Sequence, residues 1–356
     1  MTTDKGILIR NVYYMLAYAF QELRHNNYED IKGEEFENVF DLFAEILTRG
    51  VSCQLKQGLH RTYVNREESL TTMRGRILMP ETIRNYTRLV RRLHCEFDDY
   101  SENNTFNQIL KTTLSLLLHH RDVKAERKAP IRNLLRFFNG VDEISLRDIR
   151  WSALRFDRNT RPYRMLLYIC KFIIDRILLT TEAGQQRMAA FSDENMNRLF
   201  EKFVLEYYRR HHPDLNAAAR PVDWDIILAE SDTALLPAMK TDIFLQKGDR
   251  TLIIDTKYYG KSMQVHFDKA TIHSGNLYQI FSYVTNHDTG HTGKVDGMLL
   301  YAKTEADIHP DGKMRLSGGN TIYFRTLDLN QQFDNIRGQL DKIAKLLDLE
   351  LKVEIV

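Results

Sequence analysis

Apolar residues recur every three or four positions through much of the first half of the chain, which is the spacing of helices that pack on a core. The pattern is clearest at Phe36–Arg49, Asn103–His120 and Tyr163–Leu179. A shorter apolar run, Ile7–Gln21, mixes a short strand with the start of a helix. We therefore expect helices in these three ranges of the first half of the chain.

The segment between the first two of these helices interrupts the helical pattern. Val51–Tyr63 alternates in polarity as strands do, and Arg66–Thr72 is polar and typical of a turn. In Met73–Met79 a glycine, Gly75, precedes an apolar strand and indicates a bulge or the close approach of another backbone. Thr82–His94 is predicted to be a helix with a basic face. That face either contacts phosphate or an acidic partner, or is simply a solvated surface.

The second half contains two short apolar runs around a glycine. Thr241–Gln246 and Arg250–Lys257 are rich in Ile and Leu and flank a Lys-Gly-Asp turn, which predicts an antiparallel hairpin. Side chains alternate between the two faces of a strand, so Asp255 and Lys257 emerge side by side at the end of the second strand. Folding about the turn places Asp242 opposite Asp255 or the residue before it.

Two carboxylates and an amine thus converge at one end of a mostly buried sheet. Burying two carboxylates together is unfavourable unless a cation neutralises them. Carboxylate oxygens, completed by water and substrate phosphate, are the ligands that Mg²⁺ prefers. A lysine beside such a site can orient or deprotonate the attacking water and offset charge on a phosphate. We therefore expect Asp242, Asp255 and Lys257 to be catalytic, and Asp242, Asp255 and the Thr256 carbonyl to bind Mg²⁺.

An Asp-x-Lys triplet at a strand end is often only a solvated charge pair, so the motif alone is a weak signal. The neighbouring elements strengthen it. Met196–Arg210 is predicted to be an amphipathic helix that carries Glu201, and Val295–Tyr301 to be a further strand. Between them, Ser274–Val284 is predicted to be a helix.

Gln279 and Tyr283 lie one turn apart on one face of that last helix. The order helix, hairpin, helix and strand resembles the core of the PD-(D/E)xK nucleases. That resemblance implies an auxiliary metal contact for Glu201 and a supporting position near the site for Gln279 and Tyr283. Thr241 stands where these nucleases usually have a proline.

Composition narrows the class of protein. With 356 residues the chain can form two domains, and its 43% hydrophobic and 28% charged residues are ordinary for a globular protein. The net charge of +2 means that any affinity for nucleic acid comes from local patches or from a partner. The sequence contains no G-x-x-x-x-G-K-[ST] motif, so the chain should not hydrolyse nucleotides itself.

Three widely spaced cysteines, Cys53, Cys95 and Cys170, match no zinc-binding pattern and fit a reducing cytoplasm. The N-terminus has no apolar core of the kind that signal peptides carry. The most apolar run, Met165–Leu179, is too short and too charged to span a membrane. We therefore expect a cytoplasmic protein with no membrane partner.

The least structured stretch in mid-chain is Thr180–Arg187, and we place a domain boundary there. We expect an α+β N-terminal domain at residues 1–182, with helices and a small β-sheet. An α/β, restriction-endonuclease-like PD-(D/E)xK domain at residues 183–356 should follow. After its core we expect a polar stretch at Thr304–Asn320, a strand at Thr321–Thr326 and a helix at Leu329–Leu347.

Taken end to end, the chain resembles the McrC family, the nuclease subunits of McrBC modification-dependent restriction systems. The resemblance covers nearly the whole chain. It depends on RNVYYMLAYAF at Arg10–Phe20, RGRI at Arg74–Ile77, TIR at Thr82–Arg84, NTRPY at Asn159–Tyr163, CKFI at Cys170–Ile173, the TDI and IIDTKYY of the hairpin, and NLYQIFSY at Asn276–Tyr283.

This resemblance implies a division of labour between two proteins. The N-terminal domain would dock on a hexameric AAA+ GTPase, McrB, which binds the GTP, reads 5-methylcytosine and translocates double-stranded DNA. The McrC-like chain would stimulate GTP hydrolysis and cut the methylated DNA with Mg²⁺. The resemblance carries over Asp242, Asp255 and Lys257 as the catalytic set. Arg74 and Arg76 are our choice for contact with the partner, although a structural role at a strand end would also account for them.

Two other functions remain open from the sequence. The chain could be a non-catalytic subunit that stimulates a ring GTPase and clamps DNA, in which case the complex would cut no strand. It could also be a stand-alone resolvase or repair nuclease, which would cut without partner or GTP.

Overall fold

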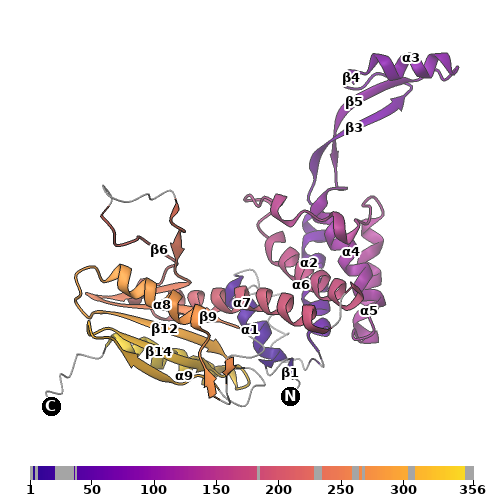
Figure 1. The fold of residues 1–356 in the computed structure, drawn as a ribbon. Coiled ribbons are helices and arrows are strands. Elements are labelled where there is room, and N and C mark those ends of the chain that lie inside the picture. Colours follow the sequence, from indigo (N-terminus) through magenta and orange to yellow (C-terminus); the bar gives the residue numbers. More distant parts are fainter. Residues whose placement is uncertain are drawn as a thin grey trace, which may run out of the picture. The chain divides into compact units, whose positions relative to one another are not determined.

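The computed structural model describes residues 3–4, 7–20, 36, 38–182, 185–227, 235–258, 264–266, 269–303 and 309–348. The chain forms two compact units. We call the first, Met1–Leu42 with Asp175–Val356, the terminal unit, because it holds both ends of the chain. The second, Phe43–Ile174, is the inserted unit. Figure 1 labels the elements of both.

The described part combines helices with several small sheets, in agreement with the predicted mixture of helix and strand. The helices are α1 (Ile9–Ala19), α2 (Val39–Gln57), α3 (Met79–Thr87), α4 (Thr105–His119), α5 (Ala125–Leu135), α6 (Tyr163–Glu182), α7 (Gln185–His211), α8 (Ser274–His287) and α9 (Phe333–Ala344). The strands are β1 (Thr3–Asp4), β2 (Ile7–Leu8), β3 (Thr62–Leu70), β4 (Arg76–Ile77), β5 (Leu93–Ser101), β6 (Pro221–Val222), β7 (Met239–Lys240), β8 (Ile243–Lys247), β9 (Arg250–Lys257), β10 (Gln264–His266), β11 (Lys269–Thr271), β12 (Val295–Ala302), β13 (Gly312–Arg315) and β14 (Thr321–Leu327).

A five-stranded mixed sheet forms the centre of the terminal unit, in the order β13-β14-β12-β9-β8. Its three inner strands are parallel to one another, and the outer strands β8 and β13 are antiparallel to their neighbours. Every residue of β12 is buried, because both faces of the strand are covered. On one face, Ile280 and Val284 of α8 pack with Phe244, Ile253 and Leu299 of the sheet. Helix α9 lies on the other face in Figure 1, and α7 packs against β9.

The predicted hairpin is confirmed as β8 and β9. Ile243 pairs with Ile254 and Lys247 with Arg250, which leaves a two-residue turn at Gly248 and Asp249. The backbone of Gly248 has φ +59°, a left-handed conformation that glycine adopts without strain. This register carries Asp242, just before β8, to the position opposite Asp255, as the sequence predicted.

The N-terminal segment packs with the C-terminal half of the chain. Asn11 Nδ2 donates to the Leu329 and Gln331 carbonyls at 2.7 and 2.8 Å. Tyr18 on α1 lies 2.7 Å from His211 Nε2 on α7. The structural division therefore differs from the predicted boundary between residues 182 and 183. The apolar face of α1 is buried on α7, a long-range contact that no local pattern in the sequence encodes.

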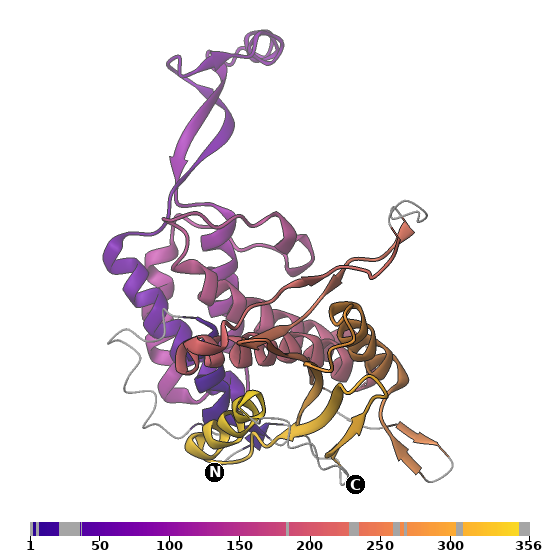
Figure 2. The same ribbon diagram turned by 90° about the vertical axis from the view of Figure 1, so that its left-hand side faces the viewer.

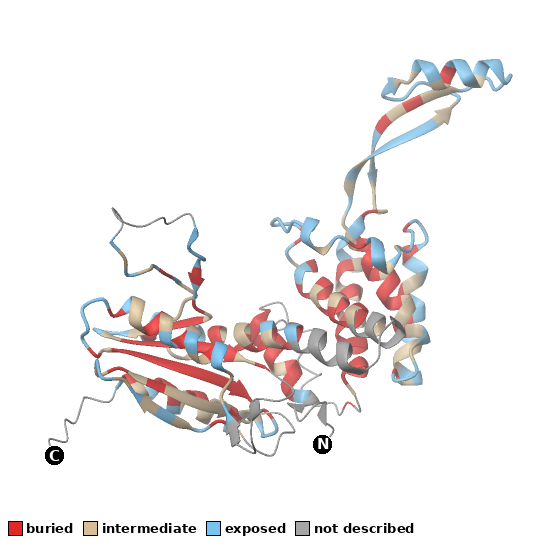
Figure 3. Cartoon of the chain, viewed as in Figure 1, coloured by how far each residue is buried: buried red, intermediate tan, exposed pale blue. Residues whose placement is uncertain are grey.

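The inserted unit combines a helical core with a long two-stranded arm. Strands β3 and β5 pair over nine residues, from Thr62 opposite Ser101 to Leu70 opposite Leu93. Strand β4 and helix α3 extend β5 at the tip, and we call all four elements the arm. Figure 2 shows the arm leaving the helices of this unit, and Figure 3 shows that most of its surface is exposed.

Three predictions in this region are wrong. Residues 51–57 continue α2, because Val51 and Gln54 fall on the buried face of that helix. The predicted turn at Arg66–Thr72 is mostly strand β3, whose polar side chains are largely exposed to solvent. The predicted basic helix ends at Thr87, because Leu89 has φ +60° and the chain then enters β5.

Two further boundaries also differ from prediction. Within Thr180–Arg187, α6 runs to Glu182 and α7 begins at Gln185, while residues 183 and 184 lie outside the described part. The polar stretch Thr304–Asn320 contains strand β13, and its residues 304–308 are likewise outside the described part. No helix in the described ranges has both the length and the hydropathy that a membrane crossing requires.

Candidate active site

The end of β9 is where the predicted site residues gather. Strand β9 is an inner strand flanked by β8 and β12, so its last residues are buried on both sides. Asp255 is only 1% exposed, although its carboxylate would be better solvated in water. Helices α7 and α8 supply the remaining side chains.

Asp255 and Lys257 form a buried ion pair. Lys257 Nζ lies 2.7 Å from Asp255 Oδ2. Neither oxygen of Asp255 accepts a hydrogen bond of normal geometry from any described group. Burial raises the pKa of Asp255 to about 7, Lys257 opposes this effect, and Asp242 and Glu201 add to it. The site therefore holds a carboxylate that its protein neighbours satisfy only in part.

Asp242 is fixed by the strand opposite. Its Oδ2 accepts hydrogen bonds from the Thr256 amide at 2.7 Å and from the Thr256 hydroxyl at 2.8 Å. Two bonds from one fully buried residue hold the carboxylate in a single orientation. Thr256 thus has a role in the site through its N–H and side chain. Its predicted role, as a metal ligand through the carbonyl, remains a prediction.

A chain of hydrogen bonds reaches Lys257 from α8. Gln279 Oε1 accepts from Lys257 Nζ at 3.1 Å, and Gln279 Nε2 donates to the Tyr283 hydroxyl at 2.8 Å. The Tyr283 hydroxyl donates in turn to the Lys240 carbonyl at 3.0 Å. This last bond leaves the Tyr283 oxygen as an acceptor, which turns the amide oxygen of Gln279 toward the lysine.

Glu201 lies on α7 within electrostatic reach of the two aspartates. Burial and the charge of Asp242 raise the pKa of Glu201 to about 7. One turn earlier on α7, Asn197 Oδ1 accepts from the Tyr258 amide at 2.8 Å and so ties the end of β9 to this helix. The structure thus brings all the predicted site residues of the terminal unit to one end of the sheet.

The donor set suits a hard divalent cation that keeps some of its water. Within the described ranges, no three His, Cys, Asp or Glu side chains form a complete metal cage. Glu201 lies within electrostatic reach of Asp242, but it does not close such a cage with the aspartates. Mg²⁺ uses one or two carboxylates and fills its other positions with water and phosphate. The carboxylate of Asp255, whose oxygens accept no hydrogen bond of normal geometry, is therefore the feature that fits this ion.

Arg74 and Arg76 lie on the arm, in the inserted unit. The Arg74 guanidinium stacks 4.1 Å from the Phe97 ring centre and lies 3.0 Å from Asp99 Oδ1. Arg76 pairs with Glu96 at 2.5 Å and stays 75% exposed. Both arginines thus brace strand β5, and their proposed contact with a partner remains a prediction.

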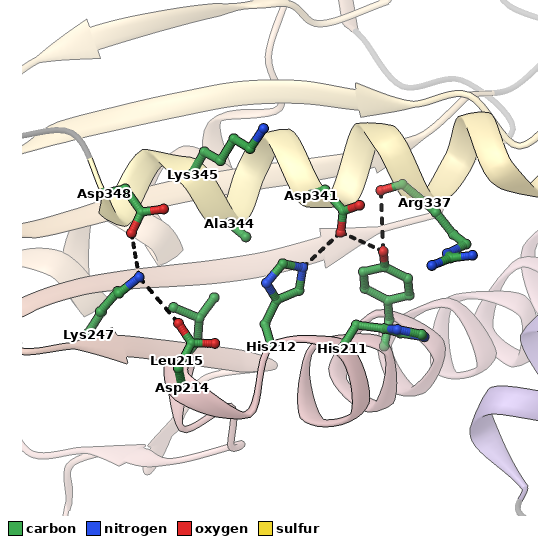
Figure 4. Close-up of a pocket in the computed structure, with 11 residues that line it drawn as sticks. His211, His212, Asp214, Leu215, Lys247, Arg337, Asp341, Ala344, Lys345 and Asp348 are labelled. Carbon is green, nitrogen blue, oxygen red and sulfur yellow. Dashed lines mark hydrogen bonds and ion pairs between the residues drawn. The ribbon is translucent and has the colours of Figure 1, made fainter.

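A hollow of about 380 Å³ lies at the opposite end of the hairpin, beside Lys247. Figure 4 shows two groups of its polar side chains that are bonded to one another, one around Lys247 and one around Asp341. Asp341 Oδ1 lies 2.7 Å from the Tyr207 hydroxyl and 2.8 Å from His212 Nε2. Lys247 Nζ lies 2.6 Å from Asp348 Oδ1. Because these groups already satisfy one another, we do not place the active site there.

Sequence reasoning missed three contributions: the Thr256 hydroxyl, Asn197 and the Lys240 carbonyl. Asn197 could have been found, because it precedes Glu201 by four residues and therefore shares its helical face. The bonds of Thr256 and of the Lys240 carbonyl depend on how strands and helix meet, which no local pattern encodes.

Comparison with known proteins agrees with the resemblance in the motifs. Residues 3–302 match the model of the family described as McrBC 5-methylcytosine restriction system component. The chain is 29% identical over 340 residues to the type IV methyl-directed restriction enzyme EcoKMcrBC of Escherichia coli (strain K12). That alignment covers 94% of this chain and 96% of the relative.

Two solved structures are similar. One is a half-complex from a tetradecameric assembly of Thermococcus gammatolerans McrB AAA+ hexamers with bound McrC. Its TM-score is 0.47 at 17% identity, over 92% of this chain and 75% of that chain. The other is the cryo-EM structure of the Thermococcus gammatolerans McrBC complex, with a TM-score of 0.40 at 19% identity, over 58% of this chain and 59% of that chain.

Proposed function

Because the chain belongs to the family of McrBC 5-methylcytosine restriction system components, we propose that it is the DNA endonuclease subunit of a modification-dependent restriction complex. It cuts methylated double-stranded DNA through a PD-(D/E)xK site and stimulates the GTPase of a McrB-like AAA+ hexamer. The partner, not this chain, binds the GTP.

The observation that carries the nuclease assignment is the burial of the Asp255 carboxylate without hydrogen bonds. A carboxylate that is 1% exposed and accepts no hydrogen bond is strongly unfavourable on its own. Its neighbours are a lysine at 2.7 Å and a second carboxylate on the opposite strand. This arrangement suits the hydrolysis of a phosphodiester. Negative charge builds up on the phosphate during that reaction, and a bound cation and the lysine can stabilise it.

We assign Asp242, Asp255 and the Thr256 carbonyl as ligands of Mg²⁺, with Glu201 as an auxiliary contact. Bound Mg²⁺ would neutralise these carboxylates and polarise the scissile phosphate. Because a ligand must be deprotonated, binding of the ion should be weaker below the pKa of about 7 that Asp255 has without it.

The protein's own side chains position the reacting groups. The ammonium of Lys257 holds the attacking water in line with the phosphodiester and stabilises negative charge on the phosphate. Gln279 fixes the lysine from the other side, at 3.1 Å, and Tyr283 fixes the amide of Gln279, at 2.8 Å. Replacing Gln279 should therefore weaken catalysis without removing it.

The arm is the proposed docking element for the partner. Its tip exposes large apolar side chains that a lone monomer would ordinarily bury: Met73, Met79, Ile83, Tyr86, Leu89 and Val90. Arg74 and Arg76 lie at the same end of the arm, beside β4 and α3. Exposed apolar residues interleaved with arginines are typical of a protein interface.

The experiment that tests this function is a plasmid cleavage assay with the chain, with and without a McrB-like partner, cytosine methylation, GTP and Mg²⁺. We expect cleavage only when all four are present. Asp255→Ala and Lys257→Ala should each lower cleavage by at least about a thousandfold and leave GTPase stimulation intact. Cleavage that survives either substitution would overturn the site. Cleavage without partner or GTP would instead favour a stand-alone nuclease.

A further inference from the structure

Residues 147–164 of the inserted unit have a higher net positive charge than the chain as a whole. They contain six arginines and two aspartates, a net charge of +4, whereas the chain as a whole carries +2. All six arginines are exposed: Arg147, Arg150, Arg155, Arg158, Arg161 and Arg164. We call this segment the arginine belt. The active site and the arm described above use none of it.

Most of this charge is not neutralised by neighbouring acids. Arg155 Nη1 donates to the Ser152 carbonyl at 3.1 Å. The side chains of Arg150, Arg158 and Arg164 make no ion pair or hydrogen bond with any described residue. Several arginines elsewhere in the inserted unit are paired with acids, as in the contact of Arg61 with Glu102 at 2.8 Å.

The aspartate at the centre of the belt holds its own turn. Asp157 Oδ1 accepts from the amides of Asn159 and Thr160 at 2.9 and 2.8 Å and from the Thr160 hydroxyl at 2.9 Å. These bonds lower the pKa of Asp157, so the carboxylate is ionised and its Oδ1 is occupied by hydrogen bonds within the turn. It therefore orders the backbone between Arg155 and Arg158 and does not bind their guanidinium groups.

The belt is anchored on the helices of its own unit. The Phe156 ring packs edge-on against Phe106 of α4, with 5.5 Å between ring centres, and Phe106 packs in the same way against Tyr163 of α6. Trp151 is half-buried, with Lys171 Nζ 5.9 Å from its ring centre. The arginines thus project from an ordered scaffold, which lowers the entropy cost when they bind a ligand.

We propose that the arginine belt binds the phosphate backbone of duplex DNA, without regard to base sequence or methylation. Guanidinium groups bind phosphate oxygens in pairs, and a solubilising surface would instead intersperse both signs of charge. The proposal rests on the proposed function, because it gives the nuclease subunit a second DNA-binding surface in addition to the cutting site. An acidic protein partner is the rival occupant.

The test measures DNA binding by the full chain without its partner. The protein carries Asp255→Asn so that it cannot cut, and the probe is a fluorescently labelled duplex of about 30 base pairs, a length that spans several phosphate contacts. Anisotropy is recorded from low to physiological salt. The variant is R150Q/R155Q/R158Q/R164Q.

We expect this variant to bind at least tenfold more weakly at low salt. The slope of log K against log salt should become shallower by about 0.9 for every phosphate that the variant no longer neutralises, and so by about 2 to 4. Methylated and unmethylated duplexes should behave alike. The corresponding four-lysine variant keeps the charge and should restore the slope, which separates the effect of charge from a folding defect.

The matched control is R84Q/R88Q/R91Q/R92Q on the arm, which removes the same charge from another exposed site. It should keep the wild-type slope. Equally weakened binding in both variants, or unchanged binding in the belt variant, would overturn the proposal. Loss of partner binding by the belt variant with unchanged DNA binding would assign the belt to a protein and also overturn it. None of these readouts requires cleavage, so a failure of the nuclease assignment would be seen separately.

Discussion

Two antiparallel strand pairs in the described part of the chain differ in nearly every physical respect. The β8–β9 hairpin lies in a five-stranded sheet, and its residues from Leu252 to Thr256 are all buried. The β3–β5 pair has only the short β4 as a neighbour and is exposed along most of β3. The same pairing geometry therefore serves two purposes. The buried pair holds a few side chains in a fixed geometry, and the exposed pair carries a surface away from its own core.

Different interactions stabilise the two pairs. Burial of Ile and Leu side chains stabilises β9, at roughly 1.5 to 3 kcal/mol for each full side chain. The arm relies on surface pairs, such as Tyr63 with Tyr100 at 5.0 Å between ring centres, that contribute about 0.2 to 1 kcal/mol each. Its base is tied down by the fully buried Asn107, which donates to the His60 and Glu102 carbonyls at 2.8 Å each.

The largest expected effect comes from removing the tip of the arm. Replacing residues 72–91 with Asn-Gly would keep Leu70 opposite Leu93 and close the arm with a tight turn. We expect GTPase stimulation to fall by about a hundredfold or more, because the apolar tip is the proposed anchor and such anchors dominate interface energies. GTP hydrolysis by the partner measures this effect. Stability against urea should change little, since Thr82 is the one buried residue among those removed.

The matched change in the other hairpin is Asp255→Asn. It should abolish cleavage and leave GTPase stimulation at the wild-type level. Together the two variants separate docking from cutting. If the shortened arm still stimulated the partner fully, the arm would lose its assigned role, whatever happened to cleavage.

The next effect concerns stability. Leu252 on β9 is 1% exposed, and Tyr63 on β3 is 74% exposed. Leu252→Ala should lower the free energy of unfolding by about 2 to 5 kcal/mol, because it removes buried methyl groups and leaves a cavity. Tyr63→Ala should change it by less than about 0.5 kcal/mol. Urea unfolding of both variants gives the comparison. Equal destabilisation would mean that the Tyr63 side chain is buried in the folded protein.

This contrast also explains what the sequence could predict. The hairpin, the helices on either side and β12 were found to within a few residues, except that α7 begins earlier than expected. They were found because buried strands are short, apolar and bounded by turn residues. The cluster of Asp242, Asp255 and Lys257 followed from strand alternation and a two-residue turn alone.

The arm could not be predicted in the same way. Its strands read TYVNREESL and LHCEFDDYS, in which polar residues occupy both faces. Strand β3 has no buried residue and no regular alternation, so its sequence resembles a turn or a loop. Strand β5 alternates only over its first part, where Cys95 and Phe97 are buried. Likewise, residues 51–57 alternate by chance while continuing a helix. Packing decided both cases, and the packing partners lie far away in the sequence.

Two glycines extend the comparison to the backbone. Gly75 in the arm and Gly248 in the hairpin both have positive φ, of +64° and +59°. A Cβ on Gly75 would lie 2.3 Å from the Glu96 carbonyl oxygen, whereas a Cβ on Gly248 would meet nothing within 4 Å. Gly75→Ala should therefore displace β4 and lower GTPase stimulation at least about tenfold. Gly248→Ala carries only the strain of its φ, about 1 to 2 kcal/mol, with normal stimulation.

GTPase stimulation and urea unfolding of the two glycine variants provide the measurement. At Gly75 two backbones approach each other closely, as the sequence suggested. Gly75→Ala should therefore impair docking more than Gly248→Ala does. Normal stimulation by Gly75→Ala would show that the position of β4 is irrelevant to the partner.

A smaller effect is expected from one hydroxyl in the site. Tyr283→Phe removes the acceptor that holds Gln279 Nε2 at 2.8 Å, and the amide can then turn away from Lys257. We expect kcat for cleavage to fall by about 3- to 10-fold, with the KM for DNA unchanged, because the lysine is less well positioned. Tyr63→Phe on the arm is the control and should change neither constant. A change in KM alone would place Tyr283 in DNA binding.

The smallest expected effect is a pH-dependent change in melting temperature. Without a metal ion, the pKa of Asp255 is raised to about 7 by burial, so the folded state binds this proton more tightly than the unfolded state does. The resulting stability is fully present below about pH 4, where both states are protonated, and is lost as pH rises through about 7. Asp255→Asn mimics the protonated form and should keep that stability at every pH.

We therefore expect Asp255→Asn to melt at the wild-type temperature near pH 4 and several degrees above it at pH 8, in the absence of divalent ions. Each kcal/mol corresponds to about 2 to 4 °C for a unit of this size. Added Mg²⁺ should raise the melting temperature of the wild type at pH 8 but not that of the variant, because the ion binds the folded carboxylates. The control is Asp98→Asn on β5, an exposed carboxylate that should show neither effect. Calorimetry at the two pH values measures all three proteins. A wild type that is as stable as Asp255→Asn at pH 8 without metal would mean that the carboxylate is already neutralised by the protein. In that case the charges of the buried hairpin would be neutralised by ion pairs within the protein, as they are on the arm.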